Sequence, residues 1–563
     1  MNLTRTTQKI KALFSSQQHT VLSAATLIMV MIVASRLLGL VRQRVLAHFF
    51  VANQLSLFFA AFRLPDTIFE VLVFGTFASA FIPVFTKTLK EDKTHKKAWE
   101  VAGLVANWGG LLFVILAGIV ITFANSLYKV ITPGFSVTDQ AQIVLLARIL
   151  FAAQGFFVIS YVLTAVLESS KRFFVPALAP LFYNLGIILS TIFFYERLGL
   201  MAPVLGVVIG SASHFLIQLP LAMKLGFRFS KSLRLTPEVK KIARLSFPRM
   251  VEVSFLQVTK FVELTLASLI SIPAYTYFTF GNTIQLLPVG LFGTSIAKAA
   301  LPTLAGQSDD LPAFKKTLFE TLNQVIFLMS PIVAFLMVVR IPVVRLIFGT
   351  DIFTWEATVE TSLVVSSFAF GIFSQSINSI LARSFYALSD TRTPVKVSIS
   401  TLMINIALDY IFVIIYKLPV WSLAAAFSFS CIVQSVALFV LITNKIHDDA
   451  KKSVYLPVLK MLFSSLVSGS VMYFILKFFD KSVWIKKLSF VTNIDLPFEM
   501  FVLDTRYSGN LLVLTSIVGL VGLLVYVLIL KLLKSKDLDV FTNLVKRIFK
   551  GNKFIPEIPL DNS

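Results

Sequence analysis

Residues 21–50 read VLSAATLIMVMIVASRLLGLVRQRVLAHFF, one of the longest apolar stretches of the chain, and this stretch contains Arg36 and Arg42. A guanidinium within hydrocarbon costs ~2.5–3.5 kcal/mol on insertion scales, so such residues usually face a wet cavity or a partner. Six residues along a helix give a net rotation of roughly 120°, which puts the two arginines on adjacent walls of one groove. The stretch therefore predicts a cationic groove inside a membrane-spanning bundle, and an anionic passenger. The alternative is that one or both side chains extend to the lipid headgroups.

The composition is that of a membrane protein. Of the 563 residues, 56% are hydrophobic and 14% are charged, whereas soluble domains average about 25% charged residues. The net charge of +22 does not indicate nucleic-acid binding, because lysines and arginines fall mainly in short loops between apolar segments. We therefore expect no nucleic-acid partner. The single cysteine, Cys431, excludes a disulfide framework and a cysteine-based metal site, and residues 1–19 lack the apolar core of a signal peptide.

Fourteen apolar windows are long enough to cross a bilayer as helices, which predicts an all-α polytopic fold. They cover residues 21–50, 55–86, 98–124, 139–168, 174–195, 200–224, 241–271, 275–304, 314–339, 356–387, 394–416, 420–443, 455–478 and 509–533. Most loops after even-numbered windows are basic, and loops after odd-numbered windows are poor in positive charge. By the positive-inside rule both termini lie in the cytoplasm, the linker 226–240 is also cytoplasmic, and the long loop 479–508 is external.

An internal repeat divides the chain into two halves in parallel orientation. Gly75-Thr-Phe-Ala-Ser-Ala-Phe-Ile-Pro83 resembles Gly293-Thr-Ser-Ile-Ala-Lys-Ala-Ala-Leu-Pro302, at an offset close to 220 residues. Repeats of this kind build transporters whose site lies between two rocking lobes. The predicted organisation is a cytoplasmic segment 1–19, an N-lobe 20–225, the linker 226–240, a C-lobe 241–447, two further helices within 448–535 and an amphipathic tail 536–563.

A Leu-Pro pair precedes each copy of this motif. Its prolines, Pro65 and Pro288, lack the amide donor that a helix interior requires, so each is expected to kink its helix. We interpret both as hinge positions of a moving bundle.

Several motifs resemble the MurJ (MviN) lipid II flippase family. They are Ala34-Ser-Arg-Leu-Leu-Gly-Leu-Val-Arg42, Phe58-Phe-Ala-Ala-Phe-Arg-Leu-Pro65, Phe174-Val-Pro-Ala-Leu-Ala-Pro-Leu-Phe-Tyr-Asn184 and Ala382-Arg-Ser-Phe-Tyr-Ala-Leu-Ser-Asp-Thr-Arg-Thr-Pro-Val-Lys396. The resemblance is collinear from about residue 20 to 445. It implies the two-lobe fold of the multidrug/oligosaccharidyl-lipid/polysaccharide exporters and the translocation of an undecaprenyl-diphosphate-linked peptidoglycan precursor. It also implies that Ser35, Arg36, Gly39 and Arg42 of the first motif belong to the substrate site.

The family's cavity commonly carries four arginines, and this chain departs from that pattern. Five positions differ, two that usually carry arginine and three that are usually acidic: Phe69, Thr283, Ser56, Phe74 and Gln43. Arg63, which precedes the expected kink, matches a basic position of the family and is a candidate for the cavity. Arg249 and Lys260 are further candidates to replace the absent arginines. The alternative is that they pair with Glu252 and Glu263, three residues further along the same helix.

A coupling-ion site is a second implication of the resemblance. Asn405 and Asp409 share a helix face within an apolar span, where an unpaired Asp would be costly. With Glu263 they resemble the Na⁺ site carried by some MurJ proteins, and hard oxygen ligands suit Na⁺ or a proton. The alternative is that Lys260 neutralises Glu263 and that a hydroxyl such as Ser428 binds Asp409.

The leading functional interpretation is a transporter rather than an enzyme. A lipid II flippase would bind the diphosphate near Arg36 and Arg42 and work by alternating access in the bacterial cytoplasmic membrane. Two alternatives stay open: export of another polyprenyl-diphosphate-linked glycan, and a non-transporting scaffold that acts with cell-wall synthesis or division proteins. A polyprenyl-phosphate glycosyltransferase would need acidic residues in an external loop, and the loop Val51 to Gln54 has none.

Overall fold

The computed structural model describes residues 21–76, 80–92, 94–230, 232–446, 455–486, 502–535 and 537–538. The predicted segment 1–19, most of the predicted tail and residues 487–501 of the predicted external loop lie outside these ranges. Within them the regular structure is helical, and the one isolated β-bridge joins Asp480 to Leu503.

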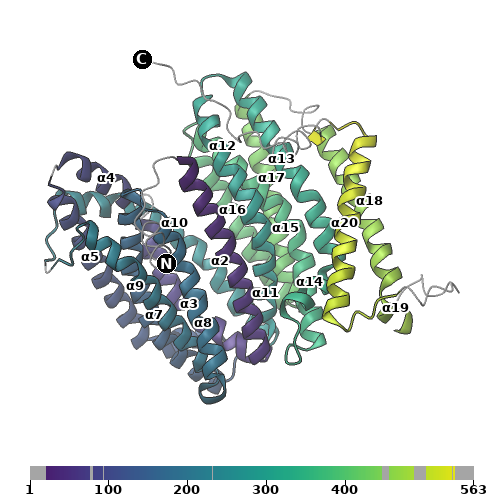
Figure 1. Ribbon diagram of the computed structural model, residues 1–563, viewed down its shortest axis with the longest axis horizontal. Helices are drawn as coiled ribbons and strands as arrows, with labels where there is room; N and C mark the ends of the chain where they lie inside the picture. The colour runs from purple at the N-terminus through teal and green to yellow at the C-terminus, as the bar shows by residue number, and fades with distance from the viewer. Residues whose placement is uncertain are drawn as a thin grey trace, which may run out of the picture. The chain divides into compact units, whose positions relative to one another are not determined.

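The described helices follow the predicted spans (Figure 1). They are α2 (Val21–Phe49), α3 (Ala52–Thr76), α4 (Ile82–Glu91), α5 (Lys96–Thr122), α6 (Ala124–Ile131), α7 (Val137–Ser169), α8 (Phe174–Leu198), α9 (Met201–Leu225), α10 (Pro237–Ile270), α11 (Ala274–Pro288), η2 (Val289–Gly293), α12 (Thr294–Gly306), α13 (Leu311–Val338), α14 (Arg340–Phe348), α15 (Trp355–Ala387), α16 (Arg392–Tyr410), η3 (Ile411–Ile415), α17 (Trp421–Lys445), α18 (Tyr455–Phe479), α19 (Lys481–Lys486) and α20 (Ser508–Leu532).

Twelve helical segments in the described part of the chain are long and apolar enough to cross a membrane. The helices α2 and α3, which lie at the first two predicted spans, are also long, and each carries three charged side chains. The predicted all-α polytopic class is therefore confirmed.

Contacts divide the chain into two compact units. Unit 1 comprises Met1–Thr283, Ile347–Thr361 and Ile406–Leu423, and unit 2 comprises Ile284–Leu346, Ser362–Asn405 and Ala424–Ser563. Unit 1 thus holds α10 and the start of α11 together with the first six predicted spans. The predicted lobes 20–225 and 241–447 stay a prediction.

In unit 1, glycines bring α8 and α9 into close contact. A Cβ at Gly210 would lie 2.5 Å from the Tyr183 carbonyl oxygen, and one at Gly186 would lie 2.6 Å from the Gly210 Cα. Small residues allow such backbone approach in membrane helices, where packing rather than water exclusion joins helices. The position of Tyr183 therefore depends on the absence of a side chain at Gly210.

Each half of the repeat contains a polar network between its fourth and sixth predicted spans. In unit 1 the Ser160 hydroxyl of α7 lies 2.7 Å from Nδ1 of His214 on α9. In unit 2 the Ser435 hydroxyl of α17 donates to Asn378 of α15 at 2.8 Å. Because the interval between His214 and Ser435 matches the repeat offset, the two networks occupy equivalent places.

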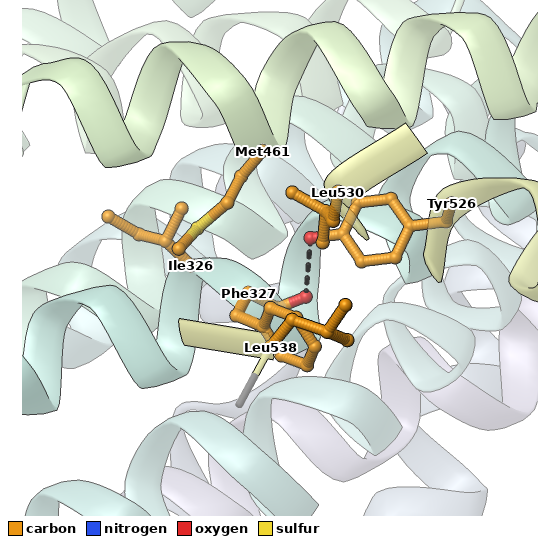
Figure 2. Close-up of a cluster of buried hydrophobic side chains, with 6 residues drawn as sticks. All are labelled: Ile326, Phe327, Met461, Tyr526, Leu530 and Leu538. Atoms are coloured by element: carbon orange, nitrogen blue, oxygen red, sulfur yellow. Dashed lines mark hydrogen bonds between the residues drawn. The ribbon is translucent and has the colours of Figure 1, made fainter. Parts of the chain in front are cut away.

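In unit 2, α18 and α20 lie side by side and pack against α13 (Figure 1). The Tyr526 hydroxyl of α20 donates to the Phe327 carbonyl of α13 at 3.0 Å. Figure 2 shows this bond among the buried side chains Ile326, Phe327, Met461, Tyr526, Leu530 and Leu538. This cluster joins the last two predicted spans, and Leu538 of the predicted tail, to α13.

The two predicted hinge prolines occupy different environments. Pro65 lies inside α3, which continues as an α-helix on both sides. Pro288 ends α11, and the π-helix η2 follows it directly. Since π-helical turns interrupt the regular ladder of an α-helix and often mark functional sites, the second position has the stronger structural sign of a hinge.

Candidate functional site

A polar cavity of about 230 Å³ lies within unit 1. Helices α2, α3, α8 and α11 supply its walls, which are the residues Arg42, Gln43, Leu46, Phe58, Phe59, Phe62, Arg63, Asp66, Tyr183, Ile187, Tyr275 and Thr279. Two guanidiniums, one carboxylate and two phenols thus line the cavity together with apolar and aromatic side chains. A cavity of this composition inside membrane-spanning helices can hold a charged group.

The two arginines of the cavity present buried donors. Among the described residues, the Nε atoms of Arg42 and Arg63 are shielded from solvent and have no hydrogen-bond acceptor. A buried unsatisfied donor on a charged group is costly, so these nitrogens favour an anionic acceptor in the cavity. Guanidiniums bind phosphate oxygens through paired donors in a planar fork.

Tyrosines hold both arginines in place. The Arg42 guanidinium carbon lies 5.9 Å from the centre of the Tyr183 ring, within the range of a cation–π contact. The Arg63 side chain interacts with the Tyr275 hydroxyl at the start of α11. The packing of α9 at Gly210 therefore reaches the cavity through Tyr183.

The first motif is only partly in the cavity. Arg42 lines it, but Ser35, Arg36 and Gly39 are not among its lining residues. Gly39 faces open space, because a Cβ there would have no heavy atom within 4 Å. Arg36 is half-buried on the same helix.

The position that usually carries a third arginine is packed into the helix bundle. The Phe69 ring centre lies 5.6 Å from that of Phe157 and 5.5 Å from that of Tyr161, both on α7. Arg63, six residues earlier on α3, supplies the second guanidinium of the cavity instead. Arg63, a candidate from the sequence, thus lies at the cavity wall, and its role stays a prediction.

Lys260 forms an ion pair with a residue of another helix, which the residue spacing along its own helix did not predict. Its Nζ lies 2.7 Å from the Glu70 carboxylate of α3, and Gln257 donates to the same carboxylate. The pair that the spacing proposed with Glu263 is therefore replaced by a bond between two helices. Arg249 is exposed on α10, and the Glu252 side chain lies outside the described part.

The three residues of the predicted coupling site, Glu263, Asn405 and Asp409, all lie in the described part of the chain. Asp409 and Asn405 lie one turn apart on α16 and both are buried. Glu263, on α10, acts electrostatically on Asp409. Among the described residues no three His, Cys, Asp or Glu side chains converge as a metal site, so a bound ion would also need amide or carbonyl oxygens.

Sequence reasoning missed four members of this region: Asp66, Glu70, Tyr183 and Tyr275. Two signals were available. Asp66 and Glu70 are acidic residues one turn apart in an apolar span, which is costly unless they are paired or functional. Tyr183 lies in one of the quoted motifs, beside Asn184.

Comparison with solved structures defines the class. A multidrug-resistance MATE transporter of the MOP superfamily, in an inward-facing conformation, matches with a TM-score of 0.58 at 14% identity, over 73% of this chain and 94% of that chain. A structure of the lipid II flippase MurJ in an inward closed conformation matches with a TM-score of 0.73 at 22% identity, over 92% of this chain and 100% of that chain. The fold is that of these helical transporters.

Sequence comparison defines the family. The model of the lipid II flippase MurJ family matches residues 45–494. A probable lipid II flippase MurJ of Vibrio cholerae is 26% identical over 540 residues, 92% of this chain and 98% of the relative. One of Borreliella burgdorferi is 25% identical over 476 residues, 82% of this chain and 91% of the relative. The chain belongs to the MurJ lipid II flippase family, a family of transporters and not of enzymes.

Proposed function

We propose that this protein moves lipid II from the inner to the outer leaflet of the bacterial cytoplasmic membrane, with its diphosphate bound between Arg42 and Arg63. The observation that carries the proposal is the pair of buried, unsatisfied guanidinium nitrogens in a cavity among membrane-spanning helices. A diphosphate of charge about −2 supplies acceptors to both forks. Arg36 adds a third positive charge on the same helix, beside the open space at Gly39.

A second cavity, in unit 2, fits the lipid part of such a substrate. It has a volume of about 400 Å³ and lies among α13, α18 and α20. Its walls are apolar apart from Ser468 and Tyr526, and the hydroxyls of both donate to backbone carbonyls, those of Gly522 and Phe327. Polar groups satisfied in this way leave an apolar surface that suits a polyprenyl chain.

Alternating access requires a defined orientation, which we propose from the loop charges. Both termini and the linker 226–240 lie in the cytoplasm, and loop 479–508 is external. Single cysteines at Ser230 and Ser489 in a Cys431→Ser background test this arrangement with an impermeant maleimide. Labelling of both from the same side would contradict the fourteen-span topology.

For the coupling ion we propose Na⁺ at Glu263 and Asp409, with Asn405 one turn before Asp409. Two observations support the assignment: Asp409 is fully buried in an apolar span, and Glu263 is close enough to act on it electrostatically. Carboxylate and amide oxygens are the ligands that a hard cation prefers.

The decisive experiment makes this chain the only flippase of a cell. A strain depleted of its own lipid II flippases would express the protein, and lipid II at the outer leaflet would be measured by its accessibility to an external modifying enzyme. We expect restored growth and restored accessibility. Restored growth with no lipid II at the outer leaflet would favour a scaffold, and failure of both would overturn the proposed function.

A further inference from the structure

Asp66 is the one carboxylate among the described residues that line the cationic cavity. It follows Arg63 by three residues on α3, so both side chains lie on neighbouring positions of one helix face. One of its oxygens accepts a hydrogen bond from Gln154 Nε2 of α7 at 2.5 Å. Gln154 is 3% exposed, so the carboxyl group is held at the cavity wall by a fixed partner.

The charged groups around Asp66 differ in whether another side chain already binds them. Arg63, Glu70, Lys260 and Arg42 act on it electrostatically. The titratable phenols nearby are Tyr128 of α6, Tyr183 of α8 and Tyr275 of α11, and Glu263 of α10 faces Arg63.

Glu70 is already engaged by two donors from α10. Lys260 and Gln257 bind its carboxylate at 2.7 Å and 2.5 Å. Among the described residues that line the cavity, the two guanidiniums therefore meet one carboxylate, that of Asp66, and these three groups together carry a net charge of one positive unit.

A diphosphate in the cavity would change the electrostatic surroundings of Asp66. The diphosphate oxygens would bind Arg42 and Arg63 and would bring two negative charges beside the Asp66 carboxylate. That carboxylate would at the same time lose part of its attraction to both arginines. Like charges in a low-dielectric site repel strongly, and a shared site then retains a proton. A protonated carboxyl also gains an O–H that can donate to a phosphate oxygen.

We propose, on the basis of the proposed function, that Asp66 takes up one proton from solvent when the diphosphate of lipid II binds, and releases it when the head group leaves. The carboxylate becomes a carboxylic acid through one new O–H bond, and no other bond changes. By taking up and releasing this proton, Asp66 keeps the net charge of the cavity close to zero both when the cavity is empty and when it holds the diphosphate.

The sign of the pH effect follows from this exchange. Since the loaded state binds one more proton than the empty state, binding strengthens as the pH falls and weakens as it rises. Over the range in which the empty site is ionised and the loaded site is protonated, the dissociation constant rises by up to about tenfold per pH unit.

Calorimetry on the purified full-length chain tests the proposal directly. Lipid II would be titrated in detergent between pH 6 and 8.5, in two buffers with different ionisation enthalpies, so that the number of protons taken up is measured. We expect close to one proton in the wild type, and none in Asp66→Asn, whose affinity should no longer depend on pH. The matched control is Glu238→Gln, since Glu238 pairs with Lys97 away from the cavity, and it should behave as the wild type.

Each outcome bears on a separate claim. Lipid II binding with no proton uptake by the wild type overturns the role of Asp66 and leaves the proposed function intact, and this arm needs no variant to fold. Proton uptake that persists in Asp66→Asn assigns it to another group and also overturns the role. Asp66→Ser provides a second neutral variant if the asparagine variant unfolds. No binding of lipid II at any pH would instead count against the proposed function.

Discussion

The Ser56 hydroxyl lies 2.8 Å from the Thr276 hydroxyl, although 220 residues separate the two in the chain. The Thr276 hydroxyl donates to the Ala52 carbonyl, so Ser56 is the donor of the bond between them. Ser56 in turn accepts from the Thr276 amide at 3.0 Å. Both residues are fully buried, and each lies near the start of the second helix of its repeat, at the predicted external side. Equivalent positions of the two predicted halves therefore meet, and we expect this contact to hold that side closed.

Ser56→Ala should weaken this closure. The substitution removes the hydrogen bonds of Ser56 to the Thr276 hydroxyl and amide and leaves the amide with the Pro273 carbonyl at 3.0 Å. The loss of a buried hydrogen bond of this kind costs about 1 kcal/mol. If the cost falls only on the closed arrangement, the open population rises about fivefold. A Thr279→Cys probe in the cavity, in a Cys431→Ser background, should then react faster with an impermeant maleimide from outside. Ser56→Thr keeps the hydroxyl and should label at the original rate, and equal rates in all three would show that the contact does not hold the side closed.

Arg36→Ala, Arg42→Ala and Arg63→Ala should each reduce transport by about tenfold or more, because truncating one partner of a buried charged pair costs about 2 kcal/mol or more. Lysine should rescue only partly, since it offers a point charge in place of a planar fork. Growth of the depleted strain, with protein levels measured by immunoblot, checks this. Full growth on the Arg42 and Arg63 alanine variants at normal protein levels would remove the cavity as the diphosphate site.

Phe69→Arg should fail to improve transport, although it restores the residue that the family usually carries there. The Phe69 ring packs against Phe157 and Tyr161, so a guanidinium at this position would be placed among aromatic rings. A charge that loses its hydration in such surroundings destabilises the fold. A lowered Tm in detergent, next to a smaller loss for Phe69→Leu, is the expected result. Unchanged Tm with faster transport would show that this position can turn toward the substrate.

Much of the fold could be predicted from the sequence because apolar length and loop charge are local properties. The charged residues of α2 were visible for the same reason, since Arg36 and Arg42 interrupt hydrocarbon-like sequence. Contacts between helices left no local signal. Lys260 and Glu70 are 190 residues apart, and spacing along one helix favoured Glu263 instead. Tyr183 became part of the site only through the close packing of α8 on α9, which no single helix specifies.

The Asp390 carboxylate ties the start of α16 to the end of α17. Lys445 Nζ lies 2.6 Å from it, and the Thr393 amide and hydroxyl donate to it. The hydrogen bond from Lys445, followed by those from Thr393, lowers the pKa of Asp390 from 3.8 to about 2. A carboxyl whose folded-state pKa is lowered adds stability that is complete above the unfolded value and is lost as the pH falls through the folded value.

Asp390→Asn should therefore lower the Tm at pH 7, and the difference from the wild type should shrink between pH 4 and pH 2. Thermal unfolding in detergent, followed by tryptophan fluorescence, measures both proteins across this range. Asp92→Asn serves as a control, because its carboxylate is also held at a low pKa, by Thr94 and Lys97, but within one loop and the helix that follows it. A constant Tm difference at all pH values would show that the charge of Asp390 is not what stabilises the contact.

Asp409 decides whether the protein is coupled to an ion. The alternatives to an ion site have become weaker. The single hydroxyl proton of Ser428 is donated to the Ser367 carbonyl at 2.6 Å, so Ser428 cannot also donate to a carboxylate. Lys260 forms its ion pair with Glu70, and it also acts electrostatically on Glu263. Asp409→Asn removes a negative charge while keeping an oxygen ligand and the volume of the side chain. We expect slower lipid II translocation in proteoliposomes and no remaining dependence on external Na⁺, with Asn405→Ala giving a partial loss of the same dependence. Wild-type rates together with unchanged Na⁺ dependence in Asp409→Asn would leave Asp409 as a packing residue.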